Sequence, residues 1–339
     1  RYFTEELKEY ETQILSAEDK ISLLELEIFS QLREKLLLDI RSILNNSTII
    51  SKVDIASSLT NIAINNDYVK PIVSNNNIIK IKDSRHPVIE QLLPPGEDFI
   101  ANDINLNSIE NQIAIITGPN MSGKSTYLRQ IGLIVIMAQI GSFVPASYAE
   151  IGIVDKLFTR VGASDNLAEG ESTFLVEMNE TANILNNATH KSLIILDEIG
   201  RGTSTYDGLS IAWAITEYIH NSKKSSSKTL FATHYHELVD LANSLDKAFN
   251  LNVDVKEIND EVVFLRKIID GGTDKSYGIY VAKMAGLPNE VILRANQILE
   301  SLSSNEKETK NIEEYSSEKL KESYDKNIDK EIISELKNI

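Results

Sequence analysis

A glycine-rich loop near the middle of the chain constrains the fold more than any other feature. Residues 118–126 read GPNMSGKST and fit G-x-x-x-x-G-K-[ST], the phosphate-binding loop of nucleoside triphosphatases. A short β-branched run at 113–117 precedes the loop, and a helical pattern follows over 127–139. Glycines allow backbone conformations that a Cβ would block, so the loop N–H groups and the start of the helix can face an anion. The sequence therefore predicts an α/β fold with a nucleotide bound at this loop.

Two side chains of the loop have the chemistry of a phosphate and metal site. Lys124 is expected to reach the β- and γ-phosphates of ATP and to act in catalysis, and the Ser125 hydroxyl is expected to bind Mg²⁺. The predicted nucleotide-binding residues are Gly118, Pro119, Asn120, Met121, Ser122, Gly123, Lys124, Ser125 and Thr126. The alternative is a glycine-rich turn with a chance lysine, and the order of strand, loop and helix argues against it.

A second apolar run ends in two carboxylates. Residues 192–198 read SLIILDE, which is typical of a buried parallel strand whose C-terminal end lies where α/β sheets bind ligands. Asp197 is expected to hold Mg²⁺ directly or through water, and Glu198 to act as the general base toward the attacking water. The alternative is that these carboxylates cap the following turn, and it is weaker for Asp197 than for Glu198.

A histidine follows a third strand-like run at 229–233. His234 is predicted to donate a hydrogen bond to the γ-phosphate as a catalytic residue. The alternatives are a core histidine, or a metal chelate with His236 on the same face of an extended segment. A chain with no cysteine and five histidines offers few further ligands for such a chelate. His236 also fits the start of a helix ahead of Glu237, and no functional role is predicted for it.

Four ordered motifs resemble the ATPase region of the MutS family of DNA mismatch repair proteins, and most of all its bacterial members. They are the loop GPNMSGKST, ESTFLVEMNETANIL at 171–185, LDEIGRGTSTYDG at 196–208 and ATHYHEL at 232–238. The resemblance covers roughly residues 85–300. The segment RYFTEELKEYE at 1–11 also resembles the end of the family's core that leads into the ATPase domain.

The resemblance implies an ABC-type P-loop fold with a mixed, largely parallel sheet, working as a homodimer with composite sites. Ser172 would then act in trans on the γ-phosphate of the partner's ATP, and Asn120 would contact the same phosphate group in cis. The loop at 200–208 would couple the two sites, and Phe99 would stack on the adenine. From the residues alone, Ser172 fits equally well as the cap of the apolar helical run after it.

Two departures from the family pattern stand out. Ser122 occupies a position where many relatives have glycine, and a variable position of the motif tolerates this. The family's mismatch reader, an N-terminal domain with a Phe-x-Glu wedge, has no counterpart before Arg1, and the chain lacks a starting methionine. We therefore expect a C-terminal fragment of a longer protein, which binds mismatched double-stranded DNA mainly through domains absent here.

Charge and composition agree with that expectation. The formal net charge of −16 argues against strong DNA binding by this piece, because a duplex binder usually carries a basic face. The chain has no cysteine, which suits a cytoplasmic protein, and no N-terminal signal pattern. Its most apolar stretch, 131–140, is too short to cross a bilayer, so no membrane partner is expected.

The expected organisation has four parts. Residues 1–66 form a helical lever whose leucines recur at three- and four-residue spacing and face a core. Residues 67–270 form the ATPase domain, with a β-rich edge at 67–112. Residues 271–302 form a helix–turn–helix-like element that supports dimer contacts, and 303–339 form a flexible charged tail.

The predicted function is ATP hydrolysis by a mismatch repair clamp component that uses Mg²⁺ and has downstream repair proteins among its partners. Two alternatives stay open. One is a relative of the same family that acts on branched or recombination DNA, because the DNA-reading domains are absent. The other is a transporter-type ABC ATPase subunit, against which the lack of an LSGGQ-like run and the presence of STFLVEM argue.

Overall fold

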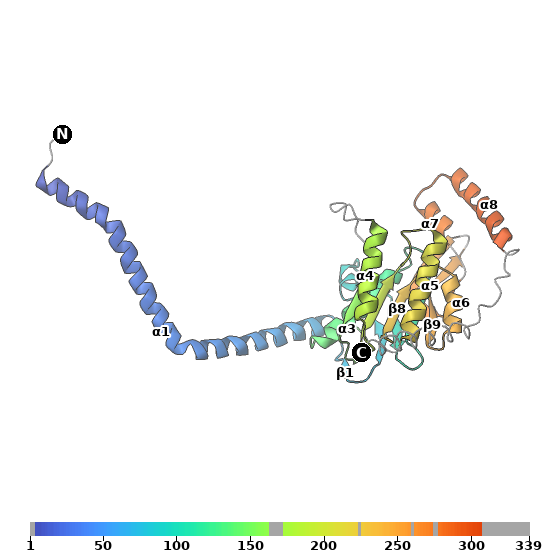
Figure 1. The fold of residues 1–339 in the computed structure, drawn as a ribbon, viewed down its shortest axis with the longest axis horizontal. Coiled ribbons are helices and arrows are strands. Elements are labelled where there is room, and N and C mark those ends of the chain that lie inside the picture. The colour runs from blue at the N-terminus through green and yellow to red at the C-terminus, as the bar shows by residue number, and fades with distance from the viewer. Residues whose placement is uncertain (1–3, 163–171, 223–224, 259–260, 274–276, 307–339) are drawn as a thin grey trace, which may run out of the picture. The chain divides into compact units, whose positions relative to one another are not determined.

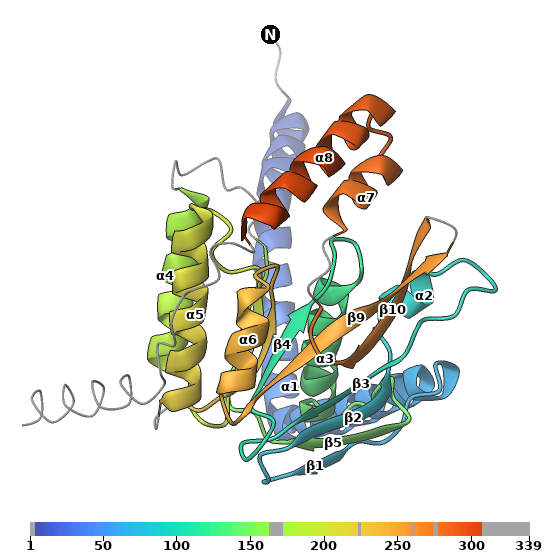
Figure 2. The same ribbon diagram turned by 90° about the vertical axis from the view of Figure 1, so that its right-hand side faces the viewer.

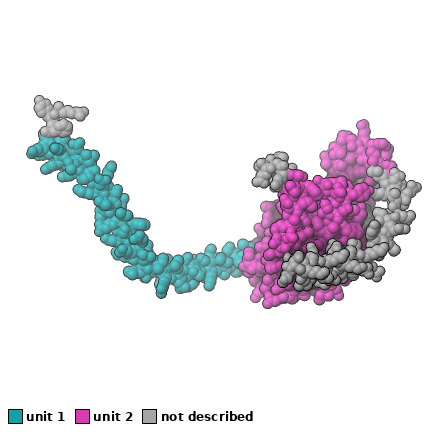
Figure 3. Space-filling model, in the orientation of Figure 1, with its two compact units in different colours: residues 1–65 teal, residues 66–339 magenta. Residues whose placement is uncertain are grey.

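The computed structural model of the chain shows two compact units, residues 1–65 and residues 66–339 (Figure 3). The structure describes residues 4–162, 172–222, 225–258, 261–273 and 277–306 (Figure 1). No helix among these residues is both long enough and apolar enough to cross a membrane.

The first unit is one helix, α1 (Glu5–Asn65), of 61 residues. The apolar residues whose spacing predicted a core-facing helix are all exposed: Leu23, Leu26, Leu32, Leu36, Leu37, Ile40 and Leu44. The spacing identified the helix, but the core that these residues were expected to face is not formed by the described residues. A periodic pattern shows that a helix has an apolar face, and it does not show what covers that face.

A six-stranded sheet forms the centre of the second unit, in the order β10-β9-β4-β8-β7-β6. The strands are β4 (Ile113–Thr117), β6 (Leu157–Arg160), β7 (Leu193–Asp197), β8 (Lys228–Ala232), β9 (Ala248–Ile258) and β10 (Glu261–Asp270). Neighbouring strands are parallel except β9 and β10, which are antiparallel. This sheet confirms the predicted α/β class. Strands β4 and β7 are buried along their whole length, and each is apolar up to its last residue.

Helices cover both faces of this sheet (Figure 2). They are α3 (Lys124–Gln139) on one face, and α4 (Thr173–Asn187), α5 (Thr205–Asn221) and α6 (Glu237–Ser244) on the other. Each face of the sheet has its own hydrophobic core. Ala114 and Ile116 of β4 belong to the core under α3, and Ile113 and Ile115 belong to the core under α4, α5 and α6. The period-two alternation of a strand thus builds two cores from one apolar run.

A second sheet has four strands in the order β1-β5-β2-β3. They are β1 (Ile72–Ser74), β2 (Ile79–Ser84), β3 (Asn102–Leu106) and β5 (Tyr148–Gly152). Residues 67–112 were expected to form a β-rich edge, but β5 comes from beyond α3 and pairs with both β1 and β2. Ile81 of β2 and Ile151 of β5 share a core with Leu128 of α3. Helix α3 therefore packs between two sheets, which fixes the loop at its start.

The remaining helices are α2 (Ile89–Leu92), α7 (Gly278–Met284) and α8 (Asn289–Glu306). Gly286, with φ of 86°, lies in the turn between α7 and α8. Helix α8 ends at Glu306, a few residues beyond the expected start of the tail at 303. The rest of that tail lies outside the described residues.

Candidate nucleotide-binding and hydrolysis site

The loop between β4 and α3 turns through three residues with positive φ. These are Gly118 (138°), Met121 (63°) and Gly123 (106°). Gly123 directly precedes α3, so its left-handed conformation favours glycine, and the N-terminus of the helix opens onto the loop. In the loop, Pro119, Ser122 and Lys124 are buried, Asn120 and Met121 are exposed, and Gly118, Gly123, Ser125 and Thr126 are half-buried.

Lys124 folds back across this loop. Its Nζ atom donates hydrogen bonds to the carbonyl oxygens of Gly118 at 2.6 Å and Pro119 at 3.0 Å. Burial lowers the pKa of Lys124 to about 8, although the nearby carboxylates of Glu198 and Asp197 oppose the change. A buried ammonium held by neutral carbonyl groups gains more from an anion, so a phosphate is a suitable replacement for these partners.

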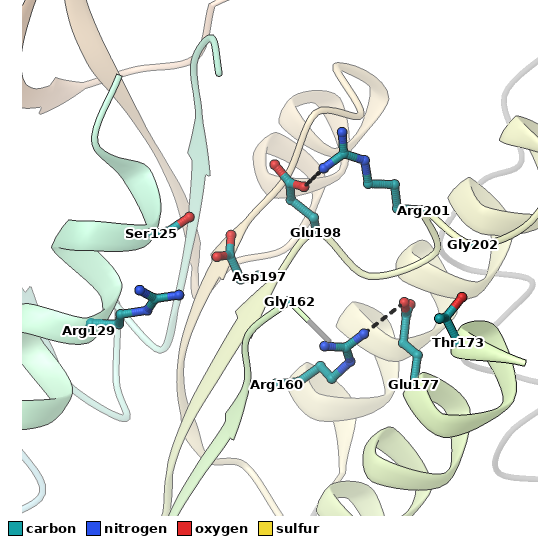
Figure 4. Close-up of a pocket in the computed structure, with 10 residues that line it drawn as sticks. All are labelled: Ser125, Arg129, Arg160, Gly162, Thr173, Glu177, Asp197, Glu198, Arg201 and Gly202. Carbon is teal, nitrogen blue, oxygen red and sulfur yellow. Dashed lines mark hydrogen bonds and ion pairs between the residues drawn. The ribbon is translucent and has the colours of Figure 1, made fainter. Parts of the chain in front are cut away.

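Asp197, the last residue of β7, faces Ser125 in the first turn of α3 (Figure 4). Asp197 is 7% exposed, and its Oδ1 atom is buried without a hydrogen-bond partner. Burial raises the pKa of Asp197, and the Ser125 hydroxyl opposes that rise. A carboxylate oxygen and a hydroxyl are hard oxygen ligands, which fit Mg²⁺ bound through few side chains together with phosphates and water.

Glu198 has a left-handed backbone, with φ of 57°, and its carboxylate is fully engaged. The Oε1 atom lies 2.5 Å from Nε2 of His234, and Oε2 accepts a hydrogen bond from Nη1 of Arg201 at 2.5 Å. The hydrogen bond from His234 is the main cause that lowers the pKa of Glu198 to about 2; burial opposes it and Arg201 adds to it. Each oxygen of the Glu198 carboxylate is thus already bound to a positively polarised N–H group.

His234 follows β8 and is exposed, so it is not a core histidine. Its ring faces Glu198, whereas Nδ1 of His236 lies 2.9 Å from the carbonyl oxygen of Thr273. The two rings have separate partners, and the chelate considered from the sequence is not formed. A cavity of about 150 Å³ brings His234 together with Asn120 of the loop. This is the arrangement expected of two groups that contact one phosphate.

A larger cavity, of about 550 Å³, opens between α3, the end of β7 and α4 (Figure 4). Its lining residues are Ser125, Arg129, Arg160, Gly162, Thr173, Glu177, Asp197, Glu198, Arg201 and Gly202. The structure thus brings Ser125, Asp197 and Glu198 together from two elements. Phe99 is half-buried in the irregular segment before β3 and lines neither of these two cavities. Its stacking on adenine stays a prediction.

Ser172 occupies the N-cap position of α4 and is exposed. Its backbone carbonyl accepts the Val176 N–H at 3.1 Å, but its side chain makes no capping hydrogen bond. The hydroxyl therefore does not serve as the helix cap in this structure. Residues 163–171, which precede it and include most of the polar stretch noted in the sequence, lie outside the described residues.

Sequence reasoning missed the charged residues Arg129, Arg160, Glu177 and Arg201 that line the larger cavity. A signal for two of them was present in the sequence. Glu177 is a carboxylate within the short apolar stretch FLVEM of a helix, and Arg160 is a charged residue at the end of a strand. Charges at such positions are buried only when they are paired, which makes them candidates for a specific contact.

The residues of this site lie in a segment that matches a known protein family. A family model described as MutS domain V matches residues 114–303. The chain belongs to the MutS family. The match begins within β4 and includes Ser125, Asp197, Glu198 and His234, so the MutS model covers most of the site described above.

Similar MutS proteins come from several bacteria. The chain is 57% identical over 304 residues to the DNA mismatch repair protein MutS of Salinibacter ruber, covering 90% of this chain and 34% of that protein. It is 57% identical over 305 residues to MutS of Clostridium tetani, covering 90% and 34%. It is 58% identical over 310 residues to MutS of Thermodesulfovibrio yellowstonii, covering 90% and 36%. The chain thus spans about a third of the length of these MutS proteins.

Proposed function

We propose that this chain is the ATP-binding and ATP-hydrolysing part of a DNA mismatch repair protein and that it works as a dimer with composite sites. The observation that carries the proposal is the meeting of Ser125, Asp197 and Glu198 around one cavity, with Lys124 at the start of α3. The ABC-type classification of the fold and the cytoplasmic location expected from the composition belong to the same proposal.

Nucleotide binding involves Lys124 and the start of α3. The Lys124 ammonium exchanges the carbonyl oxygens of Gly118 and Pro119 for the β- and γ-phosphates, to which it makes charge-assisted hydrogen bonds. The N–H groups at the start of α3 face the same anion. Phe99 stacks on the adenine in this proposal.

Ser125 and Asp197 are the proposed ligands of Mg²⁺. When bound, the ion neutralises charge on the phosphate oxygens. The buried Oδ1 atom of Asp197, which lacks a hydrogen bond, supports this assignment. A cation at that position also offsets the cost of ionising a buried carboxylate.

Glu198 accepts a proton from the attacking water. The water oxygen forms a bond to the γ-phosphorus while the bond from that phosphorus to the bridging oxygen breaks, and the electron pair stays on ADP. His234 donates a hydrogen bond to the γ-phosphate. Because Glu198 is held by His234 and Arg201 in the structure, this arrangement is the resting state of the proposed cycle.

Ser172 completes the site of the partner subunit in this proposal. It stands exposed at the N-terminus of α4, an end that favours anions, and its hydroxyl is not used as a cap. Mismatched double-stranded DNA and downstream repair proteins are the proposed partners of the longer protein. The names of the relatives, all DNA mismatch repair proteins, favour this role over one on branched DNA.

The test compares Lys124→Ala with a matched lysine variant, Lys191→Ala, at an exposed position two residues before β7. Loss of the Lys124 contact should cost roughly 1.5–3 kcal/mol, which is about ten- to a hundredfold in ATP affinity or rate. Titration with labelled ATP and a turnover assay measure both quantities. Unchanged affinity and unchanged hydrolysis in Lys124→Ala contradict the phosphate-loop assignment, and Lys191→Ala should match the wild type.

A further inference from the structure

Two side chains from other parts of the chain hold the backbone of Gly200, one at its N–H group and one at its carbonyl group. Its N–H donates a hydrogen bond to Oε1 of Glu177 at 2.5 Å, and its carbonyl oxygen accepts one from the Tyr235 hydroxyl at 3.0 Å. Glu177 belongs to α4, and Tyr235 directly follows His234. A single residue, two positions after Glu198, therefore joins three parts of the candidate site.

A buried ion pair fixes the Glu177 carboxylate. Glu177 is 4% exposed, and its Oε2 atom pairs with Nη2 of Arg160 at 3.1 Å (Figure 4). Arg160 is 5% exposed and ends β6, where it lies opposite Leu196 of β7. Such a pair often adds little net stability, but removing one partner leaves the other charge buried without it. The carboxylate is therefore held in the orientation that reaches Gly200.

The turn at Gly200 has no room to move independently of its surroundings. Gly200 has φ of 87°, and a Cβ built on it would lie 2.6 Å from the carbonyl oxygen of Gly208. A Cβ on Gly208 would overlap both the Gly200 carbonyl oxygen and the Tyr235 hydroxyl. Groups packed this closely move together, so a shift of α4 at Glu177 reaches the turn that carries Glu198.

We propose that Glu177 and Tyr235 are positioning residues that couple the Ser172 end of α4 to Glu198. The inference rests on the composite site proposed above, in which Ser172 touches the nucleotide of the partner subunit. Contact with that nucleotide fixes the position of α4. Because Glu177 of α4 is bonded to Gly200, the position of α4 then sets the position of Glu198 in the same subunit. Each subunit's base thus responds to the nucleotide in the neighbouring site.

The first test separates rate from binding. Tyr235→Phe removes the hydroxyl that donates to the Gly200 carbonyl oxygen. Glu177→Ala removes the contacts of Glu177 with both Gly200 and Arg160. Glu177→Gln keeps an acceptor for the Gly200 N–H. Single-turnover hydrolysis should slow by about fivefold or more in Tyr235→Phe and Glu177→Ala, while ATP affinity stays within about twofold. Glu177→Gln should recover part of the loss.

The matched control is Glu180→Gln. Glu180 pairs with the same Arg160, at 3.2 Å, but its side chain is 49% exposed. Its replacement should leave the hydrolysis rate unchanged. Should Glu177→Ala fail to fold, as a melting curve would show, Tyr235→Phe and Glu177→Gln still decide the question.

The second test measures the coupling itself in mixed dimers. A competent subunit is paired with a Lys124→Ala subunit at an ATP concentration that fills the intact site and leaves the weakened one empty. Its rate is compared with the rate per site of the wild-type dimer. The empty neighbour should change that rate by about fivefold or more. With Glu177→Ala or Tyr235→Phe in the competent subunit, and the homodimer carrying the same substitution as the reference, the ratio should approach one.

The outcomes separate this inference from the proposed function. A wild-type protein that turns over no ATP rejects the proposed function itself. Wild-type turnover with unchanged rates in Tyr235→Phe and both Glu177 variants rejects the positioning role alone. A mixed-dimer ratio that is the same with and without these substitutions overturns the coupling.

Discussion

The Nε2 atom of His234 lies 2.5 Å from Oε1 of Glu198, and this contact joins the ends of the neighbouring strands β8 and β7. Arg201 occupies the other carboxylate oxygen. The candidate base is therefore ionised but engaged in the resting structure, so its release is a step in the proposed cycle. The γ-phosphate is the group that would draw His234 away, because it is the more highly charged acceptor.

Replacing His234 should raise the pKa of Glu198. The hydrogen bond from His234 is the main cause that lowers it from 4.5 to about 2, so His234→Ala should move the titration upward. Because the folded pKa is depressed, the stability from this contact is present above about pH 4.5 and is lost as the pH falls toward 2. Carbon NMR of labelled glutamate carboxyls, assigned with Glu198→Gln, measures the shift. His236→Ala is the control, and equal titrations in all three proteins would contradict the contact.

ATP binding should take up a proton at alkaline pH. Burial lowers the pKa of Lys124 to about 8, and a bound phosphate should raise it again. At a pH between the pKa of the free protein and that of the ATP complex, binding therefore protonates the amine. Affinity should therefore fall as the pH rises above about 8. Calorimetry at one alkaline pH in buffers of different ionisation enthalpy reports the proton uptake. Uptake that persists in Lys124→Met would assign it to another group.

Gly208→Ala should destabilise the protein and slow hydrolysis. A methyl group there overlaps the Gly200 carbonyl oxygen and the Tyr235 hydroxyl, and forced overpacking of this kind costs about 1–3 kcal/mol. Urea unfolding and a single-turnover assay measure the two effects. Gly162→Ala is the matched control for stability, because a Cβ at Gly162 meets nothing within 4 Å. Equal stability of both variants would show that the Gly200–Gly208 contact is not close-packed in solution.

Two inactive variants should restore activity when mixed. If Ser172 acts in trans, a dimer of one Lys124→Ala subunit and one Ser172→Ala subunit has one site with both defects and one site with neither. Hydrolysis should reappear because one site in two is intact. The coupling proposed above then moves its rate away from half the wild-type rate per dimer, because the neighbouring site carries both defects. Heterodimer formation is confirmed first by tagged co-purification. A mixture that forms heterodimers and stays inactive assigns Ser172 to its own subunit or to a structural role.

The main strands of the fold could be predicted because their signal is local. Strands β4 and β7 are apolar runs followed at once by functional residues, and the loop between β4 and α3 has its own motif. Strand β5 could not be assigned to the second sheet from the sequence. It pairs with β2, from which α3 and the whole of β4 separate it along the chain, and only the folded structure sets that register.

The candidate site was predictable to the extent that each residue belongs to a motif. Ser125, Asp197 and Glu198 follow from strand ends and the loop, and the structure brings them to one cavity. The contact between Glu177 and Gly200 was not predictable, because it joins a helix and a turn through a single hydrogen bond. No periodic pattern encodes such a pair.

The most direct test of the proposed hydrolysis site is a single-turnover measurement on Glu198→Gln, with ATP affinity measured on the same sample. Glutamine keeps the shape of glutamate but does not accept the proton, so ATP should bind while hydrolysis falls by about 10²–10⁴-fold. Glu180 has an exposed side chain in α4, and Glu180→Gln should hydrolyse ATP like the wild type. Near-normal hydrolysis by Glu198→Gln would contradict the assignment of Glu198 as the base and, with it, the proposed mechanism.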